Sequence, residues 1–182
     1  MILQGKLSRL RPWRPDDADA LLPIANNIKI ARNLTTRFPH PYTEEAAHEF
    51  LERTADESQK GLSYCIEVGG CVAGGMGARQ SPEAIYLHTF TCGYWLGEAY
   101  WGRGIATEAF GIFVAHLFRE FPAQRVEASV FGWNPASARV LEKNGFVQEG
   151  RRRQAICRFG EFTDEIGYGL LRAEWESQRG WE

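Results

Sequence analysis

The residues best suited to chemistry in this chain lie in one glycine-rich stretch, from Tyr94 to Ala109. Its first residues predict the end of a strand, Gly102-Arg103-Gly104 predicts a tight turn, and the residues after the turn predict the start of a helix. Glycines allow several backbone N–H groups to converge on one point, and a helix N-terminus adds about half a positive charge there. The stretch therefore predicts a binding site for an anion such as a pyrophosphate.

Two nucleotide-binding interpretations of the glycine-rich turn fit less of the sequence. A dinucleotide fingerprint requires glycine or alanine at position 107, where this chain has Thr107, and it normally follows the first strand of its domain. A P-loop requires the pattern Gly-x-x-x-x-Gly-Lys-Ser/Thr, which the sequence does not contain. A plain tight turn that only leads into a helix remains open at this point.

The segment Trp101-Gly102-Arg103-Gly104-Ile105-Ala106 resembles the acyl-coenzyme A signature of the GNAT N-acetyltransferases, Arg/Gln-x-x-Gly-x-Gly/Ala. Gly104 and Ala106 match the signature, whereas Trp101 stands where the family usually has arginine or glutamine. The subgroup that the chain resembles is the RimJ/RimL type, which includes ribosomal-protein N-terminal acetyltransferases. The resemblance extends over nearly the whole chain, and the segments that carry it are Leu10 to Asp17, Tyr100 to Ala109, Asn134 to Ser137, Val140 to Phe146, and Glu174-Trp175.

The resemblance implies the acyl-CoA N-acyltransferase fold, of the α+β (mixed α/β) class, with a mixed, mostly antiparallel sheet of about six or seven strands and about four helices. Hydrophobic patterns and turn residues predict compatible elements. We expect strands at 7–13, 62–68, 71–79, 88–96, 125–130, 146–155 and 163–171, and helices over 18–25, from 43, over 105–118 and from 134. Gly69-Gly70 predicts a hairpin turn and Gly145 a helix C-cap. Because no linker or repeat interrupts the chain, we expect one domain over residues 1–182.

The resemblance also implies acetyl-CoA as the cosubstrate. Its pyrophosphate would meet the amides of the turn, its pantetheine arm would pair with the strand before the turn, and an amide near Leu96 would face the thioester oxygen. The implied donor-binding residues are Tyr94, Trp95, Leu96, Trp101, Gly102, Arg103, Gly104, Ile105, Ala106, Thr107, Asn134, Ser137, Arg139 and Lys143. No group of His and Cys has the spacing of zinc ligands, so we expect no metal.

Ser137 is the residue that the resemblance implies as proton donor to the departing thiolate. Many relatives carry a tyrosine one turn later, where this chain has Leu141. The alternatives are that Ser137 is solvated or bonded to the backbone, and that Asn134 serves only as a helix cap.

The general base is harder to assign, because the strand position at which many relatives carry glutamate falls in Phe90-Thr91-Cys92. His88 on this strand and Glu127 on the following one are the candidates, the first because histidine titrates near neutral pH. The alternatives are a packed or surface histidine and an exposed sheet glutamate.

Amine basicity favours a protein or peptide α-amine as the acceptor, such as a ribosomal-protein N-terminus. An α-amine has a pKa of about 8 and a lysine about 10.4, so at pH 7 about a tenth of α-amines are neutral, against a few in ten thousand lysines. An α-amine therefore needs little help from a base. A small amine such as a polyamine or aminoglycoside remains an alternative, as does a non-catalytic CoA-binding regulatory module.

Composition also bears on which classes of binding partner and which cell compartment we expect. A net charge of −2 over 182 residues argues against general nucleic-acid binding, and no apolar run approaches the ~20 residues of a membrane helix. Cysteines without C-x-x-C pairs, three of them (Cys65, Cys71 and Cys92) expected as buried strand thiols, fit a reducing cytoplasm. We expect a monomer or homodimer.

Two surface features remain open. The run Arg151-Arg152-Arg153, with Arg139 and Lys143 nearby in sequence, is either a solvated face or an attractor for the coenzyme's 3′-phosphate or an acidic acceptor. The loop from Asn33 to Tyr42, with Phe38 and His40, either flanks the acceptor entrance or packs down.

Overall fold

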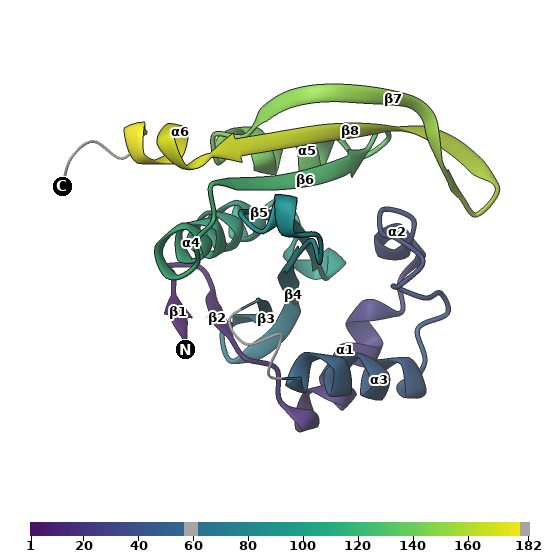
Figure 1. The fold of residues 1–182 in the computed structure, drawn as a ribbon. Coiled ribbons are helices and arrows are strands. Elements are labelled where there is room, and N and C mark those ends of the chain that lie inside the picture. Colours follow the sequence, from purple (N-terminus) through teal and green to yellow (C-terminus); the bar gives the residue numbers. More distant parts are fainter. Residues whose placement is uncertain (57–61, 179–182) are drawn as a thin grey trace. The chain divides into compact units, whose positions relative to one another are not determined.

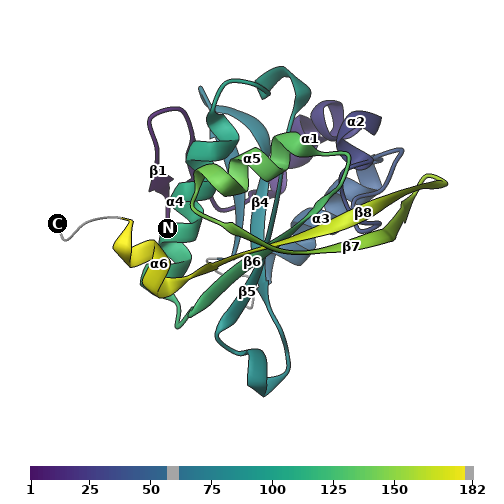
Figure 2. The ribbon, with the colours of Figure 1, turned by 90° about the horizontal axis from the view of Figure 1, so that it is seen from above.

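The computed structural model describes residues 1–56 and 62–178 (Figures 1 and 2). The strands are β1 (Leu3–Gln4), β2 (Arg9–Arg11), β3 (Ser63–Val68), β4 (Cys71–Gln80), β5 (Thr89–Leu96), β6 (Arg125–Phe131), β7 (Val147–Arg158) and β8 (Glu161–Leu171). The α-helices are α1 (Ala18–Ala25), α2 (Ile28–Ala31), α3 (Glu44–Ala55), α4 (Ile105–Glu120), α5 (Pro135–Lys143) and α6 (Arg172–Ser177). Short 3-10 turns are η1 (Pro15–Asp17), η3 (Ala84–Tyr86) and η4 (Glu98–Tyr100).

The strands form one sheet in the order β1-β2-β3-β4-β5-β6-β8-β7. Strands β5 and β6 run parallel, with Thr89 opposite Arg125, whereas the pairs β1–β2, β2–β3, β3–β4, β6–β8 and β7–β8 are antiparallel. This topology confirms the expected mixed, mostly antiparallel α+β fold. The described residues hold eight strands and six α-helices, slightly more than expected.

By internal packing the chain divides into two compact units. The first unit comprises Met1–Gly77 and Tyr94–Ile112, and the second comprises Ala78–Gly93 and Phe113–Glu182. Strands β4 and β5 and helix α4 each contribute residues to both units. The expected single domain over residues 1–182 stays a prediction.

The first unit is built on two helices, α1 and α3, that lie side by side (Figure 1). Leu21 and Ala25 of α1 and Ala47 and Leu51 of α3 are four residues apart on their helices, so each pair lies on one helix face. These faces are buried together with Cys65 of β3. The apolar stripes of the two helices therefore form one core with the sheet.

A buried ion-pair cluster fixes the path of the chain from β2 into α1. Arg11 donates hydrogen bonds to Asp17 at 2.7 and 2.8 Å and to Glu67 at 2.6 Å, and Arg9 also pairs with Glu67. Burial raises the pKa of Glu67, but the hydrogen bonds from Arg11 and Arg9 outweigh this and hold it below its ordinary value. Both acidic groups therefore share one buried guanidinium, that of Arg11.

The second unit contains the long antiparallel hairpin of β7 and β8, which Figure 1 shows along one side of β6. Helix α5 lies against β8, since the hydroxyl of Tyr168 donates a hydrogen bond to Glu142 at 3.2 Å. The core is aromatic: Phe90 contacts Phe121 at 5.6 Å between ring centroids, and Phe118 contacts Trp175 at 5.2 Å.

Several expected elements are confirmed, and others differ. Gly69 and Gly70 have φ of +58° and +83°, as a two-residue hairpin turn of glycines requires. The strand expected at 7–13 is reduced to β2, and the sequence analysis missed β1, α2 and α6 because such short elements carry no period. Cys65 and Cys92 are buried as expected, but Cys71 is exposed, because it directly follows the hairpin turn.

Replacing Arg11 tests the buried cluster. Arg11→Ala leaves the carboxylates of Asp17 and Glu67 buried without this partner, so we expect the free energy of unfolding to fall by about 3–5 kcal/mol. Arg9→Ala is the matched control, because the Arg9 side chain is 38% exposed and its loss should cost less than ~1 kcal/mol. Urea unfolding followed by circular dichroism measures both, and equal losses would contradict a special role for Arg11.

Candidate functional site

The turn before α4 has a backbone that favours glycine. Gly102 and Gly104 have φ of +72° and +78°, a region that side chains with a Cβ rarely adopt. A Cβ on Gly102 would meet nothing within 4 Å, so the space beside the turn is open on that side. The predicted tight turn is confirmed, and its glycines are required by backbone conformation.

The turn leaves a group of backbone donors available. The first helical hydrogen bond of α4 runs from Glu108 N–H to the carbonyl of Gly104 at 3.1 Å. Within residues 1–56 and 62–178, none of the amides from Gly102 to Ala106 donates to a protein acceptor. These amides stand at the positive end of a 16-residue helix, an arrangement suited to an anion.

Glu108 ties the start of α4 to the N-terminal segment. Its carboxylate accepts hydrogen bonds from the N–H groups of Lys6, Leu7 and Ser8 at 2.7–3.0 Å and from the Ser8 hydroxyl at 2.9 Å. Burial raises the pKa of Glu108, but these hydrogen bonds outweigh it and hold the pKa below its ordinary value. Leu7 comes near the turn as a result, since a Cβ on Gly104 would lie 3.6 Å from Leu7 Cδ1.

The side chains of β5 before the turn are engaged in packing. Tyr94 contacts Phe110 of α4 at 5.4 Å between ring centroids, and Trp95 contacts Phe38 at 5.3 Å. Trp101 donates an indole hydrogen bond to the carbonyl of Leu96 at 2.7 Å. Trp101 thus links the end of β5 to the turn. This role was not predicted from the sequence, where Trp101 was noted only because the family usually has arginine or glutamine at that position.

Pairing between β5 and β6 covers only the first part of β5. The register pairs Thr89 to Thr91 with Arg125 to Glu127, and no β6 partner is recorded for the rest of β5 among the described residues. At the end of β5, Gly97 N–H instead donates to Ala73 of β4 at 2.8 Å. The strand before the turn therefore keeps its β4 neighbour beyond the point where its β6 pairing stops.

In the second unit, the N-terminus of α5 forms as predicted. Asn134 is the N-cap, and its side-chain oxygen accepts a hydrogen bond from Ser137 N–H at 3.2 Å, with Pro135 in the first turn. Ser137 is half-buried, whereas Arg139 and Lys143 are exposed on the same helix. The cap role of Asn134 is therefore present, and further roles for these residues stay predictions.

The two candidate bases also lie in the second unit, and both have protein partners. His88 is exposed, and its Nδ1 lies 2.8 Å from the carbonyl oxygen of Pro122. Glu127 accepts hydrogen bonds from Thr91 at 3.2 Å and from Arg125 at 3.1 Å.

The charge of the arginine run at 151–153 is partly neutralised, because Arg151 pairs with Asp164 and Arg152 pairs with Glu165.

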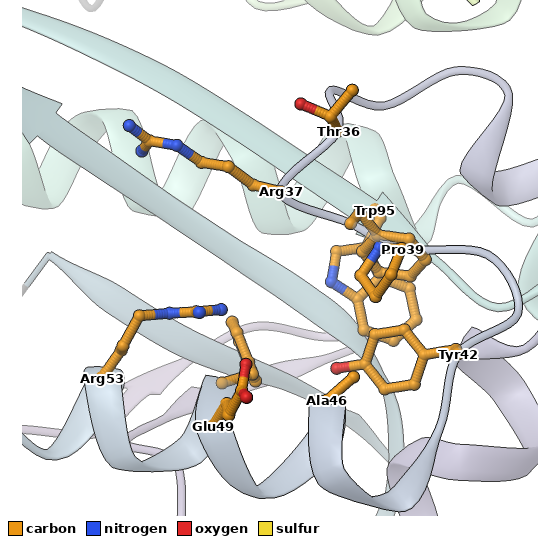
Figure 3. Close-up of a pocket in the computed structure, with 10 residues that line it drawn as sticks. Thr36, Arg37, Pro39, Tyr42, Ala46, Glu49, Arg53 and Trp95 are labelled. Carbon is orange, nitrogen blue, oxygen red and sulfur yellow. The ribbon is translucent and has the colours of Figure 1, made fainter.

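A pocket of about 280 Å³ opens in the first unit (Figure 3). Its lining comes from the loop before α3, from α3 and from β5: Thr36, Arg37, Phe38, Pro39, Tyr42, Ala46, Glu49, Phe50, Arg53 and Trp95. Phe38 and Tyr42 line it as part of the loop that we expected at the acceptor entrance, whereas His40 does not. Burial raises the pKa of Tyr42 to about 12, although Arg53 lowers it, so this phenol stays protonated at neutral pH.

The residues that α3 contributes to this pocket were not predicted from the sequence. Ala46, Glu49, Phe50 and Arg53 are spaced i, i+3, i+4 and i+7, which places them on one helix face. The N-cap Thr43 sets the start of α3, so the sequence was enough to predict that these four residues share one helix face. It was not enough to predict that this face borders a pocket, because Trp95 and the loop reach it only through tertiary packing.

Comparison with known proteins defines the family. Residues 8–147 match the Acetyltransferase (GNAT) domain family. The chain is 39% identical over 179 residues to "Probable N-acetyltransferase YjcK" of Bacillus subtilis (strain 168), covering 95% of this chain and 98% of that protein. The chain therefore belongs to the GNAT acetyltransferase family, and its resemblance to that family is confirmed.

Two further relatives concern ribosomal proteins. The chain is 27% identical over 101 residues to the [Ribosomal protein uS5]-alanine N-acetyltransferase of Escherichia coli (strain K12), covering 56% of this chain and 50% of that protein. A solved structure of RimL, a ribosomal L7/L12 alpha-N-protein acetyltransferase in complex with coenzyme A, has a TM-score of 0.83 at 23% identity, covering 94% of this chain and 98% of that one. This second likeness shows the fold. The chain spans about half the length of several curated relatives that it matches.

Neither a membrane-spanning helix nor a group of metal ligands is found among residues 1–56 and 62–178. No helix there is both long and apolar enough to cross a membrane. Over the same residues, no three His, Cys, Asp or Glu side chains are grouped so that they could hold a metal ion.

The contact between Glu108 and the N-terminal segment gives a testable prediction. Glu108→Ala should speed hydrogen exchange at Lys6, Leu7 and Ser8 by about 10- to 100-fold, since hydrogen bonds to charged groups contribute about 1.5–3 kcal/mol. In the wild type the pKa of Glu108 is lowered, so protection should be full above the unfolded pKa of about 4.3 and be lost as pH falls through the folded value. Amide exchange followed by NMR measures both effects.

Glu52→Ala is the control for this experiment, because Glu52 is exposed on α3 and carries no recorded hydrogen bond in the described part of the chain. Unchanged exchange at Leu7 in the Glu108 variant would contradict the proposed protection of the N-terminal segment by the Glu108 carboxylate.

Proposed function

We propose that the chain is an acetyl-CoA-dependent N-acetyltransferase whose acceptor is a primary amine, most specifically a protein or peptide α-amine. The observation that carries this proposal is the set of amides from Gly102 to Ala106, at the start of α4, which donate to no acceptor among the residues that the structure describes. Membership of the GNAT family supports the same reaction. The coenzyme A in the RimL complex supports the same donor.

The residues of the first unit fit the donor at two places. A pyrophosphate would accept hydrogen bonds from the turn amides, since Gly102 and Gly104 have no Cβ to keep the phosphates away. The pantetheine arm would pair with the backbone of Tyr94 to Leu96, where the recorded β6 partners have ended. The side chains of Tyr94 and Trp95 are packed, so their contribution would come from the backbone.

In this reaction the lone pair of an uncharged amine attacks the thioester carbonyl carbon. The carbon–sulfur bond breaks, the acceptor nitrogen loses one proton, and coenzyme A leaves as a thiol after its sulfur gains one. The backbone N–H near Leu96 would stabilise the negative charge that develops on the carbonyl oxygen, an effect that can contribute about 3 kcal/mol. Holding amine and thioester together would supply much of the remaining rate.

The remaining roles in the reaction are proposed from the sequence. Ser137 is proposed as the proton donor to the departing thiolate, and Asn134 as a contact to the pantetheine chain. Arg139 and Lys143 would attract the coenzyme's phosphate groups. His88 or Glu127, the latter through water, would accept the proton from the amine, and an α-amine needs little of this help.

The acceptor proposal includes a ribosomal-protein N-terminus, because two relatives carry that activity in their names. We propose a cytoplasmic protein that acts as a monomer or homodimer, without direct nucleic-acid or membrane contact.

Gly104→Val tests the donor site. The substitution forces a β-branched residue into a positive φ beside the proposed phosphate position, so we expect the affinity for coenzyme A to fall at least 100-fold in calorimetry. Gly70→Val is the matched control, because Gly70 has φ of +83° and lies in the β3–β4 hairpin turn. Unchanged affinity in the Gly104 variant, with both variants folded, would refute the phosphate role of the turn.

Ser137→Ala tests the proton donor. If Ser137 protonates the thiolate, kcat should fall about 100-fold or more, while coenzyme A affinity stays within threefold, since the cap uses the Ser137 backbone N–H. Thiol release with N-terminal peptides, polyamines and aminoglycosides provides the assay. Wild-type kcat in the variant would remove Ser137 from the chemistry, and tight coenzyme binding without thiol release from any amine would favour the non-catalytic module.

A further inference from the structure

The two faces of β5 are used differently just before the glycine-rich turn. Tyr94 packs toward α4, against Phe110, and the next residue, Trp95, points to the opposite face, where it lines the 280 Å³ pocket (Figure 3). The backbone of these residues is the proposed pairing strand for the pantetheine arm. A molecule in the pocket would therefore lie next to the strand along which the donor is proposed to run.

The walls of the pocket are aromatic. The ring of Phe38 makes an edge-on contact with Trp95 at 5.3 Å between ring centroids and a tilted contact with Tyr42 at 5.0 Å. Phe50 supports the α3 side and is held by an edge-on contact with Trp13 at 5.1 Å. Such walls favour an apolar side chain, whose burial stabilises a complex through removal of its surface from water.

The strand beneath the pocket is shaped to hold its indole ring. A Cβ on Gly75 of β4 would lie 2.7 Å from Trp95 Nε1 and 2.9 Å from Trp13 Cζ2. Only glycine therefore allows both indoles to lie against this part of the strand. This close packing fixes the aromatic wall before any ligand arrives.

The rim of the pocket is charged. Arg37 comes from the loop, and Glu49 and Arg53 come from α3; all three are exposed. In the part of the chain that the structure describes, none of the three has a hydrogen-bond or ion-pair partner. Two guanidinium groups and one carboxylate are therefore available to a ligand, with a net charge of +1.

Size limits what can enter. A volume of about 280 Å³ lies at the lower end of ligand pockets, which usually span about 300–1,000 Å³. It can take one amino-acid-sized group with little room beyond it. The rim charges would then meet the groups on either side of that residue.

We propose that this pocket selects the acceptor amine: it takes the apolar or aromatic side chain next to the reactive amine, while Arg37 and Arg53 bind a carboxylate that follows. Glu49 attracts the incoming ammonium group. The proposal rests on the proposed acetyltransferase function and narrows its substrate class. The carboxylate can come from an acidic second residue of a peptide or from a free amino acid.

The same charges disfavour polycationic acceptors. A polyamine or aminoglycoside would bring several ammonium groups to a rim that carries two guanidinium groups and one carboxylate. Like charges in such proximity weaken binding. An acceptor with one amine, one apolar side chain and one carboxylate complements all three rim residues and the aromatic wall.

The test compares acceptors that differ in one group. C-terminally amidated tetrapeptides beginning Leu-Glu, Leu-Lys and Gly-Glu, together with free leucine and spermine, are assayed by thiol release with acetyl-CoA. We expect kcat/KM for the Leu-Glu peptide to exceed that of the Gly-Glu and Leu-Lys peptides at least tenfold and fivefold, respectively. The ratio of free leucine to the Leu-Glu peptide identifies the source of the carboxylate.

Variants separate the two parts of the pocket. Phe38→Ala should reduce kcat/KM for the Leu-Glu peptide about tenfold and leave the Gly-Glu peptide within twofold. The double variant Arg37→Glu/Arg53→Glu should reverse the preference for Leu-Glu over Leu-Lys. Arg79→Glu is the control for reversing the charge of an arginine outside the pocket, because Arg79 is exposed on β4 and does not line the pocket; it should leave every ratio unchanged.

The outcomes distinguish this proposal from the function on which it rests. No coenzyme A binding in calorimetry, or no thiol release with any amine, defeats the proposed function and this inference with it. Turnover with spermine as the best acceptor, or peptide ratios that do not respond to the Arg37/Arg53 reversal, overturns the pocket assignment and leaves the acetyltransferase intact. Selective loss of the Leu-Glu preference in the variants supports it.

Discussion

The close packing of β4 against the end of β5 is the constraint on which the site in the first unit depends. A Cβ on Gly74 would collide with the carbonyl oxygen of Trp95, and one on Gly75 would collide with its indole ring. Gly74 thus allows the backbone of Trp95 to pack closely against β4, and Gly75 allows its indole ring to do the same. The strand before the turn and the aromatic wall of the pocket are fixed by the same contact.

A second constraint acts on the glycine-rich turn from the N-terminal segment. Glu108 accepts hydrogen bonds from four donors of Lys6 to Ser8, and these donors offset part of the negative charge of a carboxylate that stays ionised in the first turn of α4. An unpaired carboxylate there would oppose an anion bound at the turn. The N-terminal segment therefore leaves the helix end attractive to phosphate, while it fixes where α4 begins.

The part of the fold that sequence could predict is the part set by local signals. Thr43 capped α3 and Asn134 capped α5 as expected, because a cap is satisfied within three residues. Helix α2 was missed, although Asn27 caps it, since four residues carry no hydrophobic period. Cys71 was placed wrongly because burial at a strand end depends on what lies beside it.

The candidate site also has one part that local sequence signals predicted and one part that depends on tertiary contacts. Gly102 and Gly104 were recognised from their type and spacing, and their positive φ values agree with that reading. The rim residues Arg37, Glu49 and Arg53 look like ordinary surface charges in the sequence. The loop and helix α3 bring them around one opening, and tertiary contacts of that kind cannot be predicted from local residue spacing.

The division into two units has a consequence for how such a chain can diversify. Each unit is assembled from separate stretches, and the boundaries fall within β4, β5 and α4. Exchanging one whole unit for that of a relative would require three cuts, each through a hydrogen-bonded element. Gene recombination is therefore a poor route to a new pocket lining, whereas point substitutions in the loop and along one face of α3 would change that lining and spare the scaffold.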